Sequence, residues 1–112
     1  MNYRKVVFYK DYFKSFFIKQ PQKVKKKILW TLSLIEILPR IPETYFKYIE
    51  SSQGIYEIRV QYGSNIYRIL CFFDEEKLVI LMNAFQKKTQ KTPRQHIERA
   101  LKIKQEYEDE KK

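Results

Sequence analysis

Two arginines stand in consecutive apolar runs of the chain, where charged residues are otherwise scarce. Arg59 and Arg68 are separated by the turn-forming residues 63–65 (Gly-Ser-Asn), so pairing of the two runs as strands would bring these arginines close together. An arginine is costly to bury without a partner. Two interpretations stay open: a salt bridge with Glu57 as the nearest carboxylate, or a phosphate clamp, because guanidinium groups match phosphate oxygens in pairs.

A basic segment follows the third apolar run. Residues 85–93 read Phe-Gln-Lys-Lys-Thr-Gln-Lys-Thr-Pro, and Lys87, Lys88 and Lys91 are placed to reach back over the sheet face of the arginines. An aromatic side chain followed by cations, here Phe85 and its lysines, suits the stacking of a base and the binding of its phosphate. Taken alone, a solvated linker is the simpler interpretation of this segment.

Other catalytic sets are not formed by this sequence. His96 is the one histidine and Cys71 the one cysteine, which excludes a histidine pair, an internal disulfide and a Cys/His cluster for a metal. The acidic residues 74–76 read as a solvated turn. The two glycines, Gly54 and Gly63, are isolated, so no glycine-rich phosphate loop is present. We therefore expect no metal and no other cofactor.

The composition predicts one compact domain over residues 1–112. The chain is 44% hydrophobic and 16% aromatic, which excludes a disordered basic tail. Its longest apolar runs are far shorter than the about 20 residues that a membrane helix needs. No signal peptide is visible at the N-terminus. We expect a cytoplasmic protein.

The formal net charge of +10 is unevenly distributed. Residues 1–54 hold 11 basic and 4 acidic side chains, and residues 87–104 hold 7 and 1. Residues 55–86, which include the apolar runs, hold 3 and 4. A nearly neutral core is thus flanked by two basic segments. A polyanion is the natural partner of such a surface, and an acidic protein is the other candidate.

These residues must be positioned by elements of both kinds. The sequence predicts a strand, a helix capped by Asp11, a second helix from Pro21 to Pro39, a connecting segment, three strands, and a last helix capped by Thr92 with Gln95 completing a capping box. The predicted ranges are 3–9 for the first strand, 43–54 for the connecting segment, and 55–60, 66–73 and 78–85 for the other strands. Short polar turns between the last three strands indicate an antiparallel meander. The order is β-α-α-β-β-β-α and the fold class is α+β.

Four motifs in this order resemble one known family. Residues 54–59 (Gly-Ile-Tyr-Glu-Ile-Arg) resemble the G-[LI]-[YW]-E-[LI]-R strand of HigB-type toxins in the RelE/ParE superfamily, in the branch of phage-derived proteins. Residues 67–69 (Tyr-Arg-Ile) resemble its Y-R-[IV] strand, and residues 85–93 its F-x-K-K-[ST]-x-K-T-P loop. Residues 97–100 resemble the start of its final helix, with the acidic residue displaced by one position.

The resemblance implies a toxin of a type II toxin–antitoxin pair. Such toxins are mostly metal-independent endoribonucleases that cleave mRNA, commonly on the ribosome, and a helix-turn-helix antitoxin (HigA-like) silences them. The implied fold is a small antiparallel sheet with helices packed on one face, and RNA on the other. By motif position the implied catalytic residues are Arg59, Arg68, Lys87 and Lys88, with Lys47, Phe85, Lys91 and Arg94 binding RNA.

The proton roles and two other hypotheses stay open. Like charge would lower the pKa of Lys87 or Lys88 enough for either to act as base or acid, and Glu57 is a rival base. His96 is a poor candidate from its position. The alternatives to a nuclease are a non-enzymatic, ParE-like toxin that poisons DNA gyrase, and a decayed module that only binds the antitoxin. We expect part of the aromatic surface of the first two helices, such as Trp30, to meet that partner.

Overall fold

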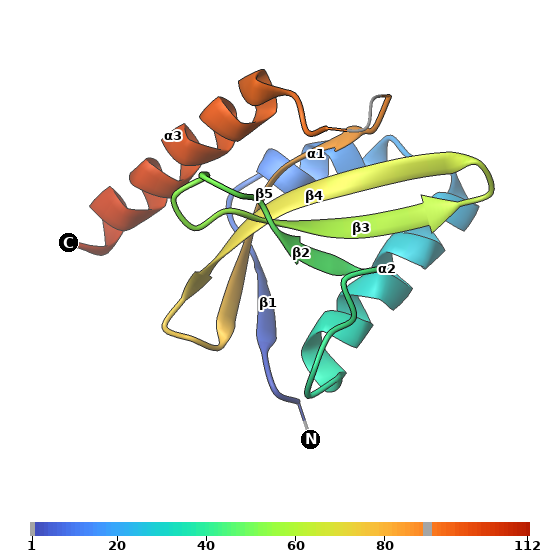
Figure 1. The fold of residues 1–112 in the computed structure, drawn as a ribbon, viewed down its shortest axis with the longest axis horizontal. Coiled ribbons are helices and arrows are strands. Elements are labelled where there is room, and N and C mark those ends of the chain that lie inside the picture. Colours follow the sequence, from blue (N-terminus) through green and yellow to red (C-terminus); the bar gives the residue numbers. More distant parts are fainter. Residues whose placement is uncertain (1, 89–90) are drawn as a thin grey trace.

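The fold has five strands and three helices in the computed structural model, which describes residues 2–88 and 91–112 (Figure 1). In chain order the elements are β1 (Lys5–Phe8), α1 (Tyr12–Ile18), α2 (Gln22–Ile37), β2 (Phe46–Tyr48), β3 (Tyr56–Tyr62), β4 (Asn65–Asp74), β5 (Leu78–Gln86) and α3 (Arg94–Lys111). The α+β class is as predicted. None of the described helices is long and apolar enough to cross a membrane.

The sheet has the strand order β1-β5-β4-β3-β2. Strands β3, β4 and β5 form the predicted antiparallel meander, and Gly63 opens the two-residue β3–β4 turn with a φ of +61°, which favours glycine. The prediction of a wholly antiparallel sheet is wrong, because β1 pairs with β5 in parallel. Parallel neighbours need a long crossover, and here the chain from α1 to β4 provides it.

A strand lies inside the segment that was predicted to be only a connection. Strand β2 pairs with the first three residues of β3, so the observed order is β-α-α-β-β-β-β-α. Aromatic packing holds this short edge strand: the ring of Phe46 stacks on Tyr56 with 5.0 Å between centroids and meets Phe73 edge-on at 5.7 Å.

Helices cover both faces of the sheet, so the expectation of helices on one face is wrong. In Figure 1, α2 and α3 lie on opposite sides of the β3–β4 hairpin. One core joins α1 and α2 to the sheet through Phe13, Ile28 and Ile35, and the other joins α3 through Ala100 and Ile103. Strands β4 and β5 are apolar on both faces, and each face needs its own cover.

The predicted helix caps are only partly correct. Asp11 precedes α1 as predicted, but its side chain makes no capping hydrogen bond. Helix α3 begins at Arg94 after Pro93, and the capping box predicted from Thr92 and Gln95 does not form. The hydroxyl of Thr92 donates to Glu57 of β3 instead, over 3.0 Å. Thr92, which was predicted to cap a helix, is therefore hydrogen-bonded to a charged residue of the sheet.

Candidate functional site

Arg59 and Arg68 are directly opposite each other on β3 and β4. Residues in register on neighbouring strands share a face, and both side chains converge on Glu57 of the same face. The Nε of Arg68 lies 3.1 Å from Oε2 of Glu57, and the Nε of Arg59 lies 3.4 Å from Oε1. The side chains of Arg68 and Glu57 are 6% and 8% exposed, and that of Arg59 is 27% exposed. Both sequence-based interpretations are thus compatible, since a salt bridge holds the arginines in place.

Lysines add to the charge around this pair. Lys47 of β2 is in register with Glu57, and Lys87 follows β5 and donates its backbone N–H to Ile66. The pKa of Lys87 is lowered, first by burial and then by the positive charges of Arg68 and Arg59, with Lys47 contributing as well. One carboxylate therefore faces four cations, which leaves the cluster strongly positive.

Thr92 joins the basic segment to the cluster. Its hydroxyl donates to the same oxygen, Oε2 of Glu57, that pairs with Arg68. Thr92 is thereby held beside the arginines, as Lys87 is at the end of β5. With both of its oxygens engaged, Glu57 has the environment of a positioning carboxylate rather than of a free base.

An aromatic pair borders the cluster on the side of α3. Phe85 is in register with Arg68, and its ring stacks on His96 at 3.9 Å with an interplanar angle of 3°. A bulge in β5, opposite the stretch between Ile69 and Cys71, brings Asn83 under α3, where its amide donates to the carbonyl of His96 over 3.1 Å. Burial and then the charge of Arg99 lower the pKa of His96, which favours the neutral form of the imidazole.

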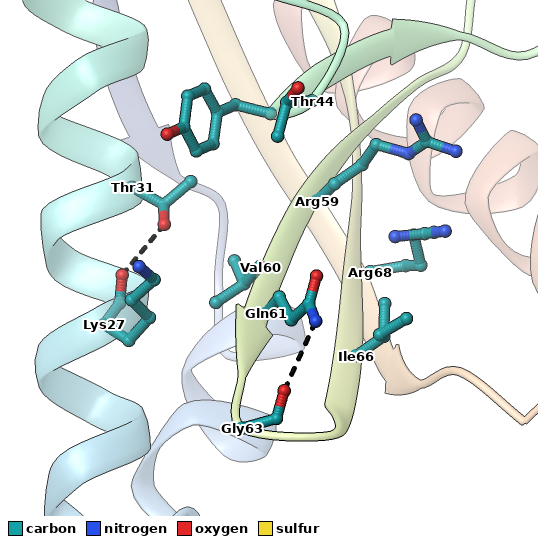
Figure 2. Close-up of a pocket in the computed structure, with 10 residues that line it drawn as sticks. Lys27, Thr31, Thr44, Arg59, Val60, Gln61, Gly63, Ile66 and Arg68 are labelled. Carbon is teal, nitrogen blue, oxygen red and sulfur yellow. Dashed lines mark hydrogen bonds between the residues drawn. The ribbon is translucent and has the colours of Figure 1, made fainter.

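A groove of about 610 Å³ opens next to the arginines. Figure 2 shows Lys27 and Thr31 of α2 on one side of the β3 end, and Arg59 and Arg68 on the other. Its ten lining residues include three cations and no carboxylate: Lys27, Thr31, Thr44, Tyr45, Arg59, Val60, Gln61, Gly63, Ile66 and Arg68. The groove has the size of a typical small-molecule cleft, roughly 300–1,000 Å³.

Three predicted site residues are exposed to solvent. Lys88 is exposed, and Arg94, with a side chain 88% exposed, pairs with Glu98 one turn along α3 at 3.7 Å. Lys91 is exposed beyond Thr89 and Gln90 of the predicted loop motif, two residues that lie outside the described part of the chain. The structure therefore brings Glu57, Arg59, Arg68, Lys47, Lys87 and Phe85 together, and does not join Lys88 or Arg94 to Glu57.

Sequence reasoning did not assign Thr92 and Lys27 to the site, and it judged His96 a poor candidate from its position. The aromatic–cation pattern of residues 85–93 includes Thr92, but the partners of Thr92 and His96 are distant in sequence and no local pattern indicates them. Among the described residues no three His, Cys, Asp or Glu side chains come together as metal ligands. The cluster can bind anionic oxygens and stabilise negative charge that develops on them.

Comparison with known proteins identifies the family. No curated protein matches the chain. The family model described as "Phage derived protein Gp49-like (DUF891)" matches residues 15–105, which include the arginine pair, Glu57, the basic segment and about the first three turns of α3. The match covers most of the chain. The chain therefore belongs to the phage-derived Gp49-like family, a family associated with RelE/HigB-type toxins.

Proposed function

We propose that the protein is a HigB-like toxin of a toxin–antitoxin system that cleaves mRNA without a metal, on the translating ribosome. The observation that carries the proposal is the pairing of Arg59 with Arg68 around Glu57. The ion pairs use the Nε atoms, and Nη1 of Arg59 donates to the carbonyl of Glu43 over 3.2 Å, so a phosphate would bind at Nη2 of Arg59 and at the Nη atoms of Arg68. Membership of a family associated with toxins supports the proposal.

The reaction that fits this cluster is internal transesterification of RNA. The 2′-oxygen attacks the adjacent phosphorus and loses its proton to a base, while the 5′-oxygen leaves and takes up a proton. The products are a 2′,3′-cyclic phosphate and a 5′-hydroxyl end. Negative charge grows on the phosphoryl oxygens in the transition state, and Arg59 and Arg68 would stabilise it from fixed positions.

Lys87 is the base that we favour. Arginine does not deprotonate in proteins, and Glu57 is occupied by Arg59, Arg68 and Thr92. A lowered pKa raises the fraction of Lys87 that is neutral, which is the form that accepts a proton. His96 is the second candidate, because its pKa is also lowered.

The partners of this function are mRNA on the ribosome and a cognate helix-turn-helix antitoxin of the HigA kind. The family's association with toxin–antitoxin systems supports the antitoxin. The surplus of positive charge supports the RNA, because each phosphate contact releases counterions.

The experiment is to express the protein without antitoxin and to map new 5′-hydroxyl ends of RNA within minutes, with Arg68→Ala beside the wild type. We expect new ends inside coding regions with the wild type and none with Arg68→Ala. Arg59→Ala should behave alike. A folding check by circular dichroism and by binding of the antitoxin keeps a loss of activity from being a loss of structure.

Two other outcomes would replace the proposal. Growth arrest with intact transcripts and double-strand breaks in DNA would indicate a gyrase-poisoning toxin on the same fold. Expression without any effect on growth or RNA would indicate a module that only binds its antitoxin.

A further inference from the structure

A stretch of sheet edge is left open beside the arginine cluster. Strand β2 pairs only with Tyr56–Ile58, and the next bond on that edge runs from the N–H of Arg59 to the carbonyl of Tyr45. The carbonyl of Pro42 accepts hydrogen bonds from the N–H groups of Tyr45 and Phe46. This turn marks the end of the stretch that pairs with the edge of β3. The groove of about 610 Å³ occupies the edge that remains, between the end of β3 and α2.

Lys27 and Tyr45 line the side of the groove away from the arginines, and Trp30 contacts both of them from beside the groove. The Nζ of Lys27 lies 4.3 Å from the ring centroid of Trp30, and the ring of Trp30 meets that of Tyr45 edge-on at 5.8 Å. Lys23 lies one turn before Lys27 on the same side of α2 and is exposed. Trp30 remains 45% exposed although it is a large apolar side chain. Cations at the start of a helix oppose its dipole, so local stability does not favour them there.

We infer that this groove binds the single-stranded RNA that flanks the scissile phosphate, with a phosphate on Lys27 and a base against Tyr45. The inference rests on the proposed function, because it extends the path of the same substrate beyond Arg59 and Arg68. Continuity supports it, since one groove is lined by Lys27 at one end and by both arginines at the other (Figure 2). Stacking on an aromatic ring and contact with a cation are how single strands are held without reading their sequence.

Charge distinguishes RNA from a peptide at this edge. An open strand edge also suits an added peptide strand. The lining, however, contains Lys27, Arg59 and Arg68 and no carboxylate, which favours a ligand that has a negative charge at every unit of its chain. A peptide is therefore the other outcome of the test.

The test uses Trp30, the only tryptophan of the chain, as a reporter. The full-length protein is titrated with a 2′-O-methyl RNA of about 12 nucleotides, a length within the range of single-strand sites. This RNA offers no 2′-hydroxyl and is not cleaved. Binding is followed by the anisotropy of labelled RNA and by the emission of Trp30. We expect saturable binding, a change in Trp30 emission, and an affinity that falls as salt rises.

Variants locate the RNA. Lys27→Ala should weaken binding about tenfold and lower the salt slope by about one. Tyr45→Leu should weaken binding, and Tyr45→Phe should restore it, because the ring and not the hydroxyl is used. Lys5→Ala is the matched control, since Lys5 is exposed on β1 at the opposite edge of the sheet. It should bind as the wild type does.

Each contrary result has a separate meaning. The inference about the groove would be wrong if RNA bound without changing Trp30 emission and if Lys27→Ala had the same RNA affinity as Lys5→Ala. The nuclease proposal would stand in that case. If the emission of Trp30 changed with the antitoxin and not with RNA, the groove would be a site for a peptide at the sheet edge and not for RNA. A failure of the nuclease proposal itself is detected separately, as the absence of new 5′-hydroxyl ends of RNA in cells.

Discussion

The hydroxyl of Thr92 donates to Oε2 of Glu57 over 3.0 Å, across 35 positions of sequence. The same carboxylate pairs with Arg59 and Arg68, so one side chain organises two strands and the basic segment. A neutral hydroxyl adds a bond without adding charge. The cluster thus keeps its positive surplus while Thr92 is held beside it.

Thr92→Val tests this tether, because valine keeps the shape and loses the donor. A hydrogen bond to a charged group contributes about 1.5–3 kcal/mol, and misplacing a reacting group slows the chemistry steeply. We expect RNA cleavage to fall about tenfold while the helical content of the protein is unchanged. Thr92→Ser keeps the hydroxyl and should restore most of the rate. Equal rates in Thr92→Val and the wild type would show that the tether is not used.

Glu57→Gln tests the carboxylate as the centre of the charge cluster. The side chains of Glu57 and Arg68 are 8% and 6% exposed, so solvent screens their pairing little. Removing one partner of a buried pair leaves the other uncompensated, and we expect the free energy of unfolding to fall by about 3 kcal/mol. Urea unfolding measures this. Glu76→Gln, in the exposed β4–β5 turn, is the control and should change stability by less than about 0.5 kcal/mol.

The same variant should respond more strongly to anions. With the carboxylate gone, sulfate can bind between the arginines, and a ligand of the folded state stabilises it. Sulfate stabilises proteins in general, so the informative quantity is the extra gain of Glu57→Gln over the wild type. An equal gain in both proteins would show that Glu57 does not compete with an anion for Arg59 and Arg68.

The pH dependence of cleavage tests Lys87. A base acts in its neutral form, so the rate should rise with pH until the pKa of Lys87, which burial and the two arginines hold below the ordinary 10.5. Lys87→Arg keeps the charge but does not deprotonate, and it should remove this rise. His96→Gln should leave the rise in place. A rise that survives in Lys87→Arg and disappears in His96→Gln would transfer the role of base to His96.

Acid should loosen the C-terminal half of α3. Glu106 and Glu110 bond Lys10, Tyr12 and Tyr9, and these bonds lower the pKa of both carboxyls, with Lys10 the largest cause for each. A lowered folded-state pKa gives stability that is present above the ordinary 4.5 and is lost as pH falls through the folded-state value.

Hydrogen exchange of residues 101–111 measures this loosening. Exchange should speed up below about pH 4.5, after correction for its intrinsic pH dependence. Because these groups are exposed, salt should reduce the effect. Lys10→Gln removes the cation that both carboxylates share, so the acid-dependent increase in the exchange rate should be smaller in this variant. Acid-dependent opening of equal size in Lys10→Gln would show that other groups control α3.

The sequence predicted the pairing of Arg59 with Arg68 but not the pairing of β1 with β5. The alternation of residues 55–60 placed Arg59 and Glu57 on one face, and the short turn at residues 63–65 set Arg68 opposite Arg59, so local pattern was sufficient. The parallel pairing of β1 with β5 was out of reach, because it depends on how a long crossover returns across the sheet.

Two features were present in the sequence and were misinterpreted. The unbroken apolar runs at residues 69–73 and 78–82 are typical of strands covered on both faces, and they already argued against helices on one face only. Thr92-Pro93 is typical of a helix cap. The Thr92 hydroxyl nevertheless bonds to Glu57, because hydrogen bonds to an ionised carboxylate are stronger than those to neutral groups.

The central claim is tested most directly by RNA cleavage with purified protein in a reconstituted translation reaction, with Arg68→Ala as the control. The mRNA is supplied in two forms, all-ribose and with 2′-deoxy substitution at the mapped cleavage site. We predict that the wild type yields a 5′-hydroxyl end at that site on the all-ribose mRNA, and none on the substituted mRNA or with Arg68→Ala. Cleavage that survives the deoxy substitution or the loss of Arg68, or intact mRNA with the wild type, would contradict the account.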